Sequence, residues 1–278
     1  MGALSFVCLK CLIAVATAVV IGCGGSDSAP GGRVVVAPFA PTMVALTQHQ
    51  FSAVVPGTTD QRVAWASNAG QIALDGTFTA PIRPGRYIVT ATSVADSSKR
   101  GSVEVVVTSI GAALRAGGYV VWFRHASATI GVDNPNGPTG WWQRCDSSVA
   151  RQLDANGETQ ARAIGAAIRA QSIPIGRVVT SEFCRSRRTA ELMALGVTPE
   201  TSIDITYLQP QYATTGPVQW LQELPRAGTN IFLIAHSQGQ SVPMLGPLDQ
   251  GDAAIFRSEA QGRYSFVARA RPSDWSQM

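Results

Sequence analysis

Only three histidines occur in the chain, at positions 49, 125 and 236, so any histidine chemistry must use these side chains. Arg124 and His125 come directly after one apolar run, and His236 follows a second. A third run is followed by Arg185. Arginine matches phosphate oxygens with a planar, always charged guanidinium, and a neutral imidazole is a nucleophile near neutral pH. Together they could hold a phosphoryl dianion and attack its phosphorus, although each histidine alone could equally be a capping or core residue.

The elements that must position these side chains alternate between strand and helix from residue 110 onward. Ligands bind at the carboxyl ends of strands in open α/β sheets, where residues distant in sequence converge. The pattern predicts an α/β sheet, mostly parallel, flanked by helices on both faces. The predicted strands are 119–123, 177–180, 203–205, 231–235 and a late antiparallel strand at 263–268; the predicted helices are 157–170, with Asn156 as its N-cap, and one through 189–193.

The preceding part of the chain, residues 33–108, is predicted to be all-β. Runs rich in β-branched residues alternate with turn residues there, a spacing typical of a β-sandwich. His49 falls in a predicted turn and is expected on the surface. The predicted strands lie within 33–36, 50–54, 63–66, 76–79, 87–92 and 102–107.

The N-terminus carries an apolar run over residues 11–21, too short to cross a bilayer. It is typical of a secretory signal over residues 1–22. The run ends at Val20-Ile21-Gly22-Cys23, which resembles a bacterial lipobox. The resemblance implies cleavage before Cys23, a lipid on its thiol and a Gly/Ser-rich tether over 23–32. An ordinary cleaved signal or an uncleaved anchor is the alternative. We expect a bacterial cell-envelope protein, lipid-anchored to the membrane and either periplasmic or cell-surface.

Two cysteines, Cys145 and Cys184, remain after the predicted signal and lipidation site. An even pair in an oxidising compartment is expected to form a disulfide, with two buried free thiols as the alternative. Neither cysteine has a neighbour at metal-ligand spacing, so no metal site is expected.

The composition places the chain among globular proteins. It has 278 residues, of which 45% are hydrophobic and 14% charged, which excludes a disordered solvating chain. The length predicts two domains or one large one. The net charge of +4 is too small to indicate nucleic-acid binding.

Four segments in order resemble the histidine phosphatase (phosphoglycerate mutase-like) superfamily. They are Val120-Val121-Trp122-Phe123-Arg124-His125-Ala126, residues 153–165, residues 180–190 and Ile234-Ala235-His236-Ser237. The resemblance covers about residues 118–270, within a predicted domain at 110–278. Residues 63–68, 75–81 and 85–93 resemble bacterial Ig-like repeats, which implies a spacer or adhesion module over 33–108 and a possible envelope partner for it.

The superfamily resemblance implies a phosphoric monoester hydrolase without cofactor or metal. His125 would be the nucleophile that becomes phosphohistidine, and Arg124, Arg185 and His236 would bind and stabilise the phosphoryl group. Phosphomonoesters or phosphoramidates, in small molecules or phosphoproteins, are the implied substrates. A phosphoglycerate mutase is disfavoured, because such enzymes work in the cytosol and carry longer insertions over the pocket. Arg188 aligns with a variable position and is expected outside the pocket.

Two departures from the superfamily pattern stand out. Ala126 replaces the usual glycine, and residues 207–211 offer no carboxylate where many relatives place an acidic glutamate. The small phosphohistidine-phosphatase branch lacks this acid as well. Glu182, Asp146 or Glu223 could substitute for it, although each could equally be a surface carboxylate. The alternative function is a catalytically weak or inactive envelope module that binds phosphorylated ligands or serves as a scaffold.

The segment between the nucleophile and Cys145 is expected to form the rim of the pocket. Trp141 and Trp142 could stack on an apolar part of the substrate or could pack the loop itself. A disulfide between Cys145 and Cys184 would tie this rim to Arg185.

Overall fold

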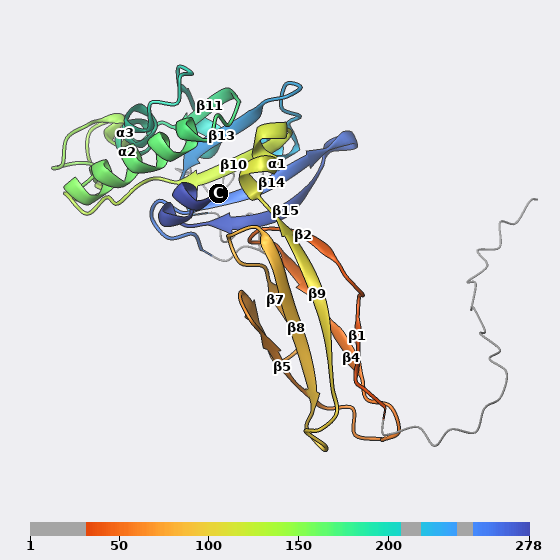
Figure 1. Cartoon of the computed structure of the whole chain (residues 1–278). Helices are drawn as coiled ribbons and strands as arrows, with labels where there is room; N and C mark the ends of the chain where they lie inside the picture. Colours follow the sequence, from red (N-terminus) through yellow and green to blue (C-terminus); the bar gives the residue numbers. More distant parts are fainter. Residues whose placement is uncertain (1–31, 207–217, 238–246) are drawn as a thin grey trace, which may run out of the picture.

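The computed structural model describes residues 32–206, 218–237 and 247–278. An elongated β region leads into a mixed sheet covered by helices (Figure 1). The predicted signal peptide, Cys23 and the segment 207–211 lie outside the described residues. Within the described part, every helix is too short or too polar to cross a bilayer.

The N-terminal region is all-β, as predicted, and its strands form three sheets. A four-stranded sheet has the order β2-β9-β8-β5, a three-stranded sheet has the order β3-β7-β6, and β1 pairs with β4. Phe51 and Phe78 are fully buried between strands. The strands are β1 (Val35–Ala37), β2 (Thr42–Val44), β3 (Gln48–Gln50), β4 (Ser52–Val54), β5 (Val63–Ser67), β6 (Gln71–Ile72), β7 (Thr77–Thr79), β8 (Gly85–Ser93) and β9 (Arg100–Thr108).

The prediction of a turn at His49 is wrong. His49 lies in β3, where it pairs with Phe78 of β7. Its ring packs edge-on against Phe51, with ring centroids 5.4 Å apart. The cross-strand pairing with β7 therefore extends β structure to Gln48 and His49, before the predicted strand that starts at residue 50.

The second sheet has the order β12-β11-β13-β10-β14-β15. Strands β10 to β13 are parallel to one another, β14 pairs antiparallel with β10, and β15 pairs antiparallel with β14. The late antiparallel strand is therefore confirmed. The strands are β10 (Tyr119–Arg124), β11 (Ile175–Ser181), β12 (Glu200–Ser202), β13 (Asn230–Ala235), β14 (Ala253–Glu259) and β15 (Arg263–Ala270).

The prediction of a strand at residues 203–205 is wrong, because Ile203–Ile205 forms a turn of 3-10 helix directly after β12. The hydroxyl of Ser202 accepts a hydrogen bond from the backbone N–H of Asp204, and this cap starts the turn. The apolar pattern of the segment reflects burial of Ile205 rather than a strand.

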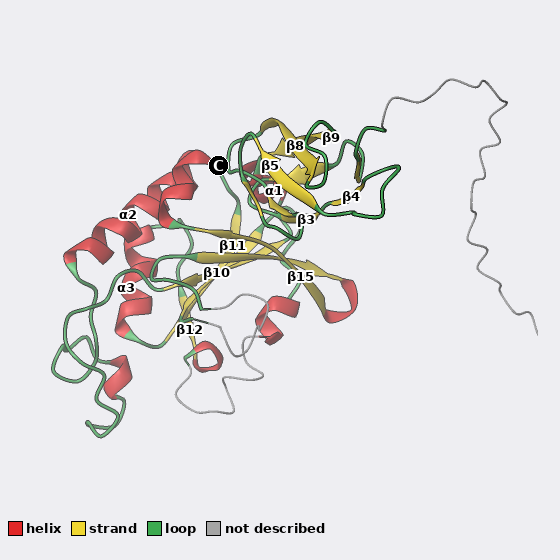
Figure 2. Cartoon of the chain, turned by 90° about the horizontal axis from the view of Figure 1, so that it is seen from below, coloured by secondary structure: helices red, strands yellow, loops and turns green. Residues whose placement is uncertain are grey.

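Both faces of the mixed sheet are covered. Successive side chains of β10 point to opposite faces, and both sets are buried. Val121 and Phe123 belong to one buried cluster that also contains Ile164 and Ile168 of helix α2. Val120 and Trp122 belong to a second cluster on the other face, with Ile205, Leu221 and Leu248. Figure 2 shows α2 and α3 side by side along one face. Helices α1 (Ile110–Ala116), α2 (Ala155–Ala170) and α3 (Cys184–Met193) belong to this part, and residues 218–222 are also helical.

Helix α2 begins at a cap that also holds the loop after His125. Asp154, not the predicted Asn156, is the N-cap residue, and its carboxylate accepts a hydrogen bond of 2.8 Å from the backbone N–H of Gly157. The hydroxyls of Ser127 and Thr129 donate to the same carboxylate at 2.7 Å. One aspartate therefore joins the helix start to the loop.

Two glycines bring α2 into direct backbone contact with its neighbours. A Cβ atom at Gly157 would lie 2.0 Å from the backbone oxygen of Ser127, and one at Gly165 would lie 1.9 Å from that of Met193 at the end of α3. Neither position has room for a side chain.

Candidate active site

The two histidines meet because they follow neighbouring parallel strands. Strand β10 pairs with β13 so that Arg124 lies opposite Ala235. The next residue, His125, donates its backbone N–H to the Ala235 oxygen at 3.0 Å. The rings of His125 and His236 then lie with centroids 5.5 Å apart. The strand ends thus place two imidazoles side by side at the sheet edge where α/β proteins bind ligands.

His125 is held in one neutral tautomer. The side chain is buried, and its Nδ1 lies 2.8 Å from the backbone oxygen of Ala126. A carbonyl oxygen only accepts, so Nδ1 carries the hydrogen and Nε2 keeps its lone pair. Burial, reinforced by the positive charge of Arg185, lowers the pKa of His125 to about 3. The ring is therefore neutral near pH 7, the form required of a nucleophile.

Arg185 lies in the first turn of α3 and is almost completely buried, with 4% of its surface exposed. Its Nη1 donates to the Asp133 carboxylate at 2.9 Å, and its guanidinium carbon lies 4.0 Å from the Phe183 ring centroid. Burial lowers the pKa of Arg185 to about 10, which leaves it charged near neutral pH. Its Nε is buried without a hydrogen-bond partner.

Arg124 is the last residue of β10 and directly precedes His125. Its Nη1 donates to the backbone oxygen of Leu248 at 2.8 Å. Its backbone N–H donates to the backbone oxygen of Asp252 at 2.9 Å. Burial and the nearby charge of Arg151 lower the pKa of Arg124. The backbone contacts fix the last residue of β10 next to the nucleophile.

His236 is packed between polar and aromatic neighbours. Its Nε2 lies 3.0 Å from the hydroxyl of Ser181, at the end of β11, and its ring packs edge-on against Phe183 with centroids 5.0 Å apart. Burial, followed by the charge effects of His125 and Arg185, holds the pKa of His236 well below its ordinary value. The site therefore pairs two neutral imidazoles with charged arginines.

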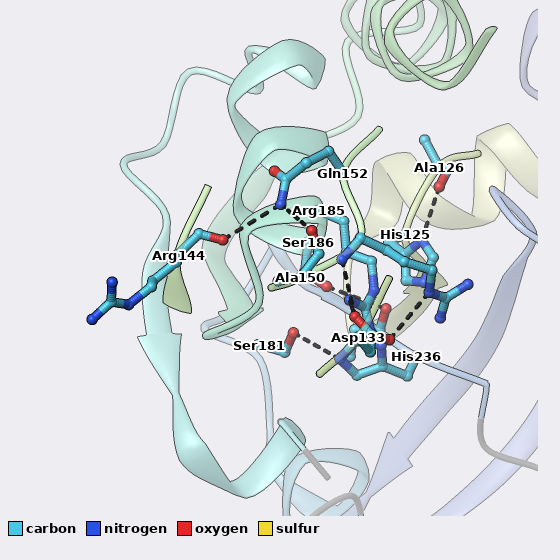
Figure 3. A network of polar contacts seen from close by, with 12 residues as sticks. His125, Ala126, Asp133, Arg144, Ala150, Gln152, Ser181, Arg185, Ser186 and His236 are labelled. Atoms are coloured by element: carbon cyan, nitrogen blue, oxygen red, sulfur yellow. Dashed lines mark hydrogen bonds and ion pairs between the residues drawn. The ribbon is translucent and has the colours of Figure 1, made fainter. Parts of the chain in front are cut away.

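Two further residues, Asp133 and Arg151, belong to the same network and are missed by sequence reasoning. The Asp133 carboxylate accepts a hydrogen bond from Arg151 Nε at 3.1 Å as well as from Arg185. Figure 3 shows Asp133 among His125, Arg185 and His236. Burial opposes ionisation of Asp133, but the hydrogen bonds from Arg151 and the charge of Arg185 outweigh it and hold its pKa below the ordinary value. Both residues lie in irregular loops, where no strand or helix period marks them.

The predicted disulfide between Cys145 and Cys184 is confirmed, with Cα atoms 5.3 Å apart. It ties the loop after the nucleophile to the first residue of α3, directly before Arg185. Trp141, in the short 3-10 helix Trp141–Gln143, packs edge-on against Phe183 with centroids 5.6 Å apart. The Trp142 indole N–H donates to Glu182 at 2.9 Å. Trp141 thus continues an aromatic wall that reaches His236, and Trp142 is engaged by the carboxylate beside it.

Two of the three candidate general acids, Glu223 and Asp146, have partners other than the histidines and arginines of the site. Glu223 pairs with Arg177, at 2.7 Å, near the start of β11 and therefore at the opposite end of that strand from the site. Asp146 is exposed and accepts hydrogen bonds from Ser148, which hold its pKa below the ordinary value, the wrong direction for an acid.

Glu182 is the remaining candidate acid, and it lies directly before Phe183 with its carboxylate on Trp142. Arg188 pairs on the surface with Glu158 and Glu191, outside the pocket as expected. In residues 32–206, 218–237 and 247–278, no group of three or more histidines, cysteines or carboxylates is arranged to hold a metal ion.

Residues 124–206 match the model of the histidine phosphatase superfamily, branch 1. Among solved structures, the chain is similar to the protein histidine phosphatase SixA complexed with tungstate (19% identity, TM-score 0.42, covering 56% of this chain and 98% of that one). It is also similar to a phosphoserine phosphatase variant from Entamoeba histolytica in complex with phosphoserine (12%, 0.38, 56% and 98%).

A third similar structure is the alpha-ribazole phosphatase from Shigella flexneri (14%, 0.36, 55% and 96%). A comparison with curated proteins found no match. The family match includes Arg124, His125 and Arg185, three of the residues that meet at the strand ends. The chain therefore contains a histidine phosphatase superfamily domain, matched over residues 124–206.

Proposed function

We propose that this protein is an exported, lipid-anchored phosphatase that hydrolyses phosphomonoesters or phosphoramidates through a phosphohistidine intermediate on His125. The superfamily match supports phosphatase activity in general. The observation that carries the finer proposal is the state of His125: a buried, neutral ring whose Nδ1 donates to Ala126 and whose Nε2 retains its lone pair among charged arginines.

In the first step, His125 Nε2 attacks phosphorus, the P–N bond forms and the bond to the leaving group breaks. Arg124 and Arg185 stabilise the charge on the phosphoryl oxygens. The hydrogen bond from Nδ1 to Ala126 keeps the ring in the reactive tautomer while positive charge develops on it. The buried positions of His125 and Arg185 strengthen these electrostatic interactions, because little water screens them.

In the second step, water attacks the phosphorus of the phosphohistidine. The new P–O bond forms, the P–N bond breaks, and the electron pair returns to Nε2 of His125. One proton of the water stays on the released phosphate and the other passes to solvent. His125 regains its neutral form, which its low pKa favours over the imidazolium near pH 7.

The proposed substrates carry good leaving groups, such as aryl phosphates or phosphoramidates. General-acid assistance contributes about 10²- to 10⁴-fold, and poor leaving groups depend on it most. The carboxylate of Glu182 is bound by the Trp142 indole, and that of Asp133 is held ionised by two arginines. The aromatic wall of Trp141 and Phe183 would contact an apolar or aromatic leaving group.

Export and lipid anchoring at Cys23 complete the proposal. The disulfide between Cys145 and Cys184 supports an oxidising compartment, because disulfides persist outside the reducing cytosol. The β region would then act as a spacer of Ig-like type between the membrane and the phosphatase domain, or would bind an envelope partner. Mass spectrometry of the N-terminal peptide, with Cys23→Ser alongside, tests the anchor: an unmodified Cys23 in the native host would exclude it.

The catalytic proposal is tested by trapping the intermediate on the full chain. Rapid mixing with an aryl phosphate, followed by alkaline quench and peptide mass spectrometry, is expected to find phosphate on the peptide that contains His125. His125→Ala is expected to lose both the phosphopeptide and turnover, whereas the matched control His49→Ala, in β3, retains both. Equal turnover by His125→Ala and the unmodified chain would overturn the proposal.

A further inference from the structure

Asp133 is an acidic side chain in a site otherwise suited to anions. Its two oxygens are shared between arginines: Oδ1 accepts from Arg185 Nη1 at 2.9 Å, and Oδ2 accepts from Arg151 Nε at 3.1 Å. The backbone N–H of Arg151 adds a third hydrogen bond to Oδ1, at 3.0 Å. One carboxylate therefore bridges the guanidinium groups of Arg151 and Arg185, which are 34 positions apart in the sequence. This carboxylate lies beside His125, the proposed nucleophile (Figure 3).

When Asp133 bridges Arg151 and Arg185, one N–H donor of Arg185 makes no hydrogen bond. Arg185 Nε is buried and has no hydrogen-bond partner, although Nη1 of the same group is bound. A carboxylate offers two oxygens, and both are already engaged. A phosphoryl group has three oxygens that can accept hydrogen bonds, so it could bind both guanidinium groups and also reach the unused donor. The arginines thus fit a larger oxyanion better than they fit Asp133.

Arg151 also acts on the site through its charge. Burial is the main cause that lowers the pKa of His125, His236, Arg124 and Arg185, and the charge of Arg151 adds to this effect at each of them. Its side chain remains 35% exposed, against 4% for Arg185. Of the two guanidinium groups that Asp133 bridges, that of Arg151 is therefore the one accessible to solvent, and that of Arg185 is buried.

We infer that Arg151 is a third phosphate-binding arginine and that Asp133 is the internal anion that substrate phosphate displaces from Arg151 and Arg185. The inference rests on the proposed function for the identity of the substrate. It makes Asp133 a competitor of the substrate: the carboxylate keeps the arginines together in the free protein and opposes phosphate binding.

Equilibrium binding of inorganic phosphate to the full chain tests this, by titration calorimetry near neutral pH. Arg151→Gln is expected to weaken phosphate binding about 10- to 100-fold, the usual effect of losing a charged hydrogen bond. Asp133→Asn is expected to strengthen binding several-fold, because the competing negative charge is gone. The matched control is Arg144→Gln, an exposed arginine of the same loop, which should bind phosphate like the unmodified chain.

Asp133→Asn separates competition from simple positioning. If Asp133 only oriented the arginines, Asp133→Asn would weaken binding, and that result would overturn its assignment as a competitor. Unchanged binding by Arg151→Gln would overturn the third-arginine assignment.

Arg151→Lys is the control for misfolding. It keeps the positive charge and should bind phosphate more tightly than Arg151→Gln. Equally weak phosphate binding by the two variants would contradict the assignment. Binding needs no turnover, so a chain that binds phosphate with these differences but hydrolyses nothing would refute the phosphatase proposal alone.

Discussion

The polar side chains of the β region and those at the strand ends of the mixed sheet form two different kinds of network. In the β region, the aspartates bond to residues two positions away: Asp60 to Arg62, Asp75 to Thr77 and Asp96 to Ser98. At the mixed sheet, Ser181 and His236 are 55 positions apart and Asp133 and Arg185 are 52 apart. Local, exposed pairs shape turns. Buried groups gathered from distant segments, with shifted pKa values, are what functional sites require.

The largest expected effect is the loss of activity on changing His125. His125→Ala removes the attacking nitrogen, so turnover of an aryl phosphate should fall by at least about 10³-fold, as for other groups that act directly on the substrate. Steady-state kinetics with His49→Ala as control measure this difference. A fall of less than about tenfold would mean that His125 is not the reacting group, although it lies among buried residues from distant parts of the sequence.

The second effect concerns the disulfide that ties the rim to Arg185. Closing a loop of 39 residues stabilises the folded chain by about 3–4 kcal/mol, and the double variant Cys145→Ser, Cys184→Ser should lose this. Activity should fall on reduction at denaturant concentrations where the chain remains folded, because the loop that carries Trp141 is released. Urea unfolding followed by fluorescence, with activity assayed in parallel, measures both. Coincident loss of activity and structure would assign the disulfide to stability alone.

The third effect is a pH dependence of stability. His125 has a pKa of about 3 when folded, against 6.5 ordinarily, so the unfolded chain binds more protons between these values. Stability should therefore fall as pH drops from 6.5 towards 3, by up to about 1.4 kcal/mol per pH unit from this residue. The His125→Asn variant should show a shallower slope in urea unfolding across that window. Identical slopes would contradict the burial of a neutral ring.

The smallest effect is expected in the β region. Asp60→Asn removes an exposed ion pair with Arg62, a kind of interaction that contributes little to stability. Neither turnover nor the urea midpoint should change measurably, in contrast to every variant at the strand ends. A substantial loss of turnover in Asp60→Asn would break the distinction between the two networks.

Sequence reasoning predicts the parts of the site that are fixed by strand geometry. Arg124 ends strand β10, and His125 and His236 directly follow β10 and β13. Neighbouring parallel strands end at the same edge of a sheet. The disulfide is predicted because Cys145 and Cys184 are the two cysteines outside the predicted signal and lipidation site. Several longer elements, among them β9, β10, β13 and α2, are also predicted, because their hydrophobic period is repeated often enough to be recognised. The seven-residue elements α1 and β14 are absent from the prediction.

The remaining features depend on tertiary contacts. Asp133 reaches Arg151 only because a long loop folds back on itself, and no local pattern records that path. The same holds for His49, whose strand is defined by its partner Phe78. The N-cap of α2 is Asp154, two positions before the predicted Asn156. Aspartate and asparagine both cap helices well, and the hydrogen bonds from Ser127 and Thr129 favour Asp154.

The two glycines of α2 have a consequence for how the protein tolerates mutation. Alanine is the mildest substitution in most helices, but at Gly157 it would meet the backbone oxygen of Ser127, two residues after His125. At Gly165 it would meet the backbone of Met193. In a library of single variants, these positions should therefore be as intolerant as the reacting residues, and the variants should fail through displacement of the helix. Screening for function alone would count them as part of the active site, and only a parallel screen for folded protein would separate them.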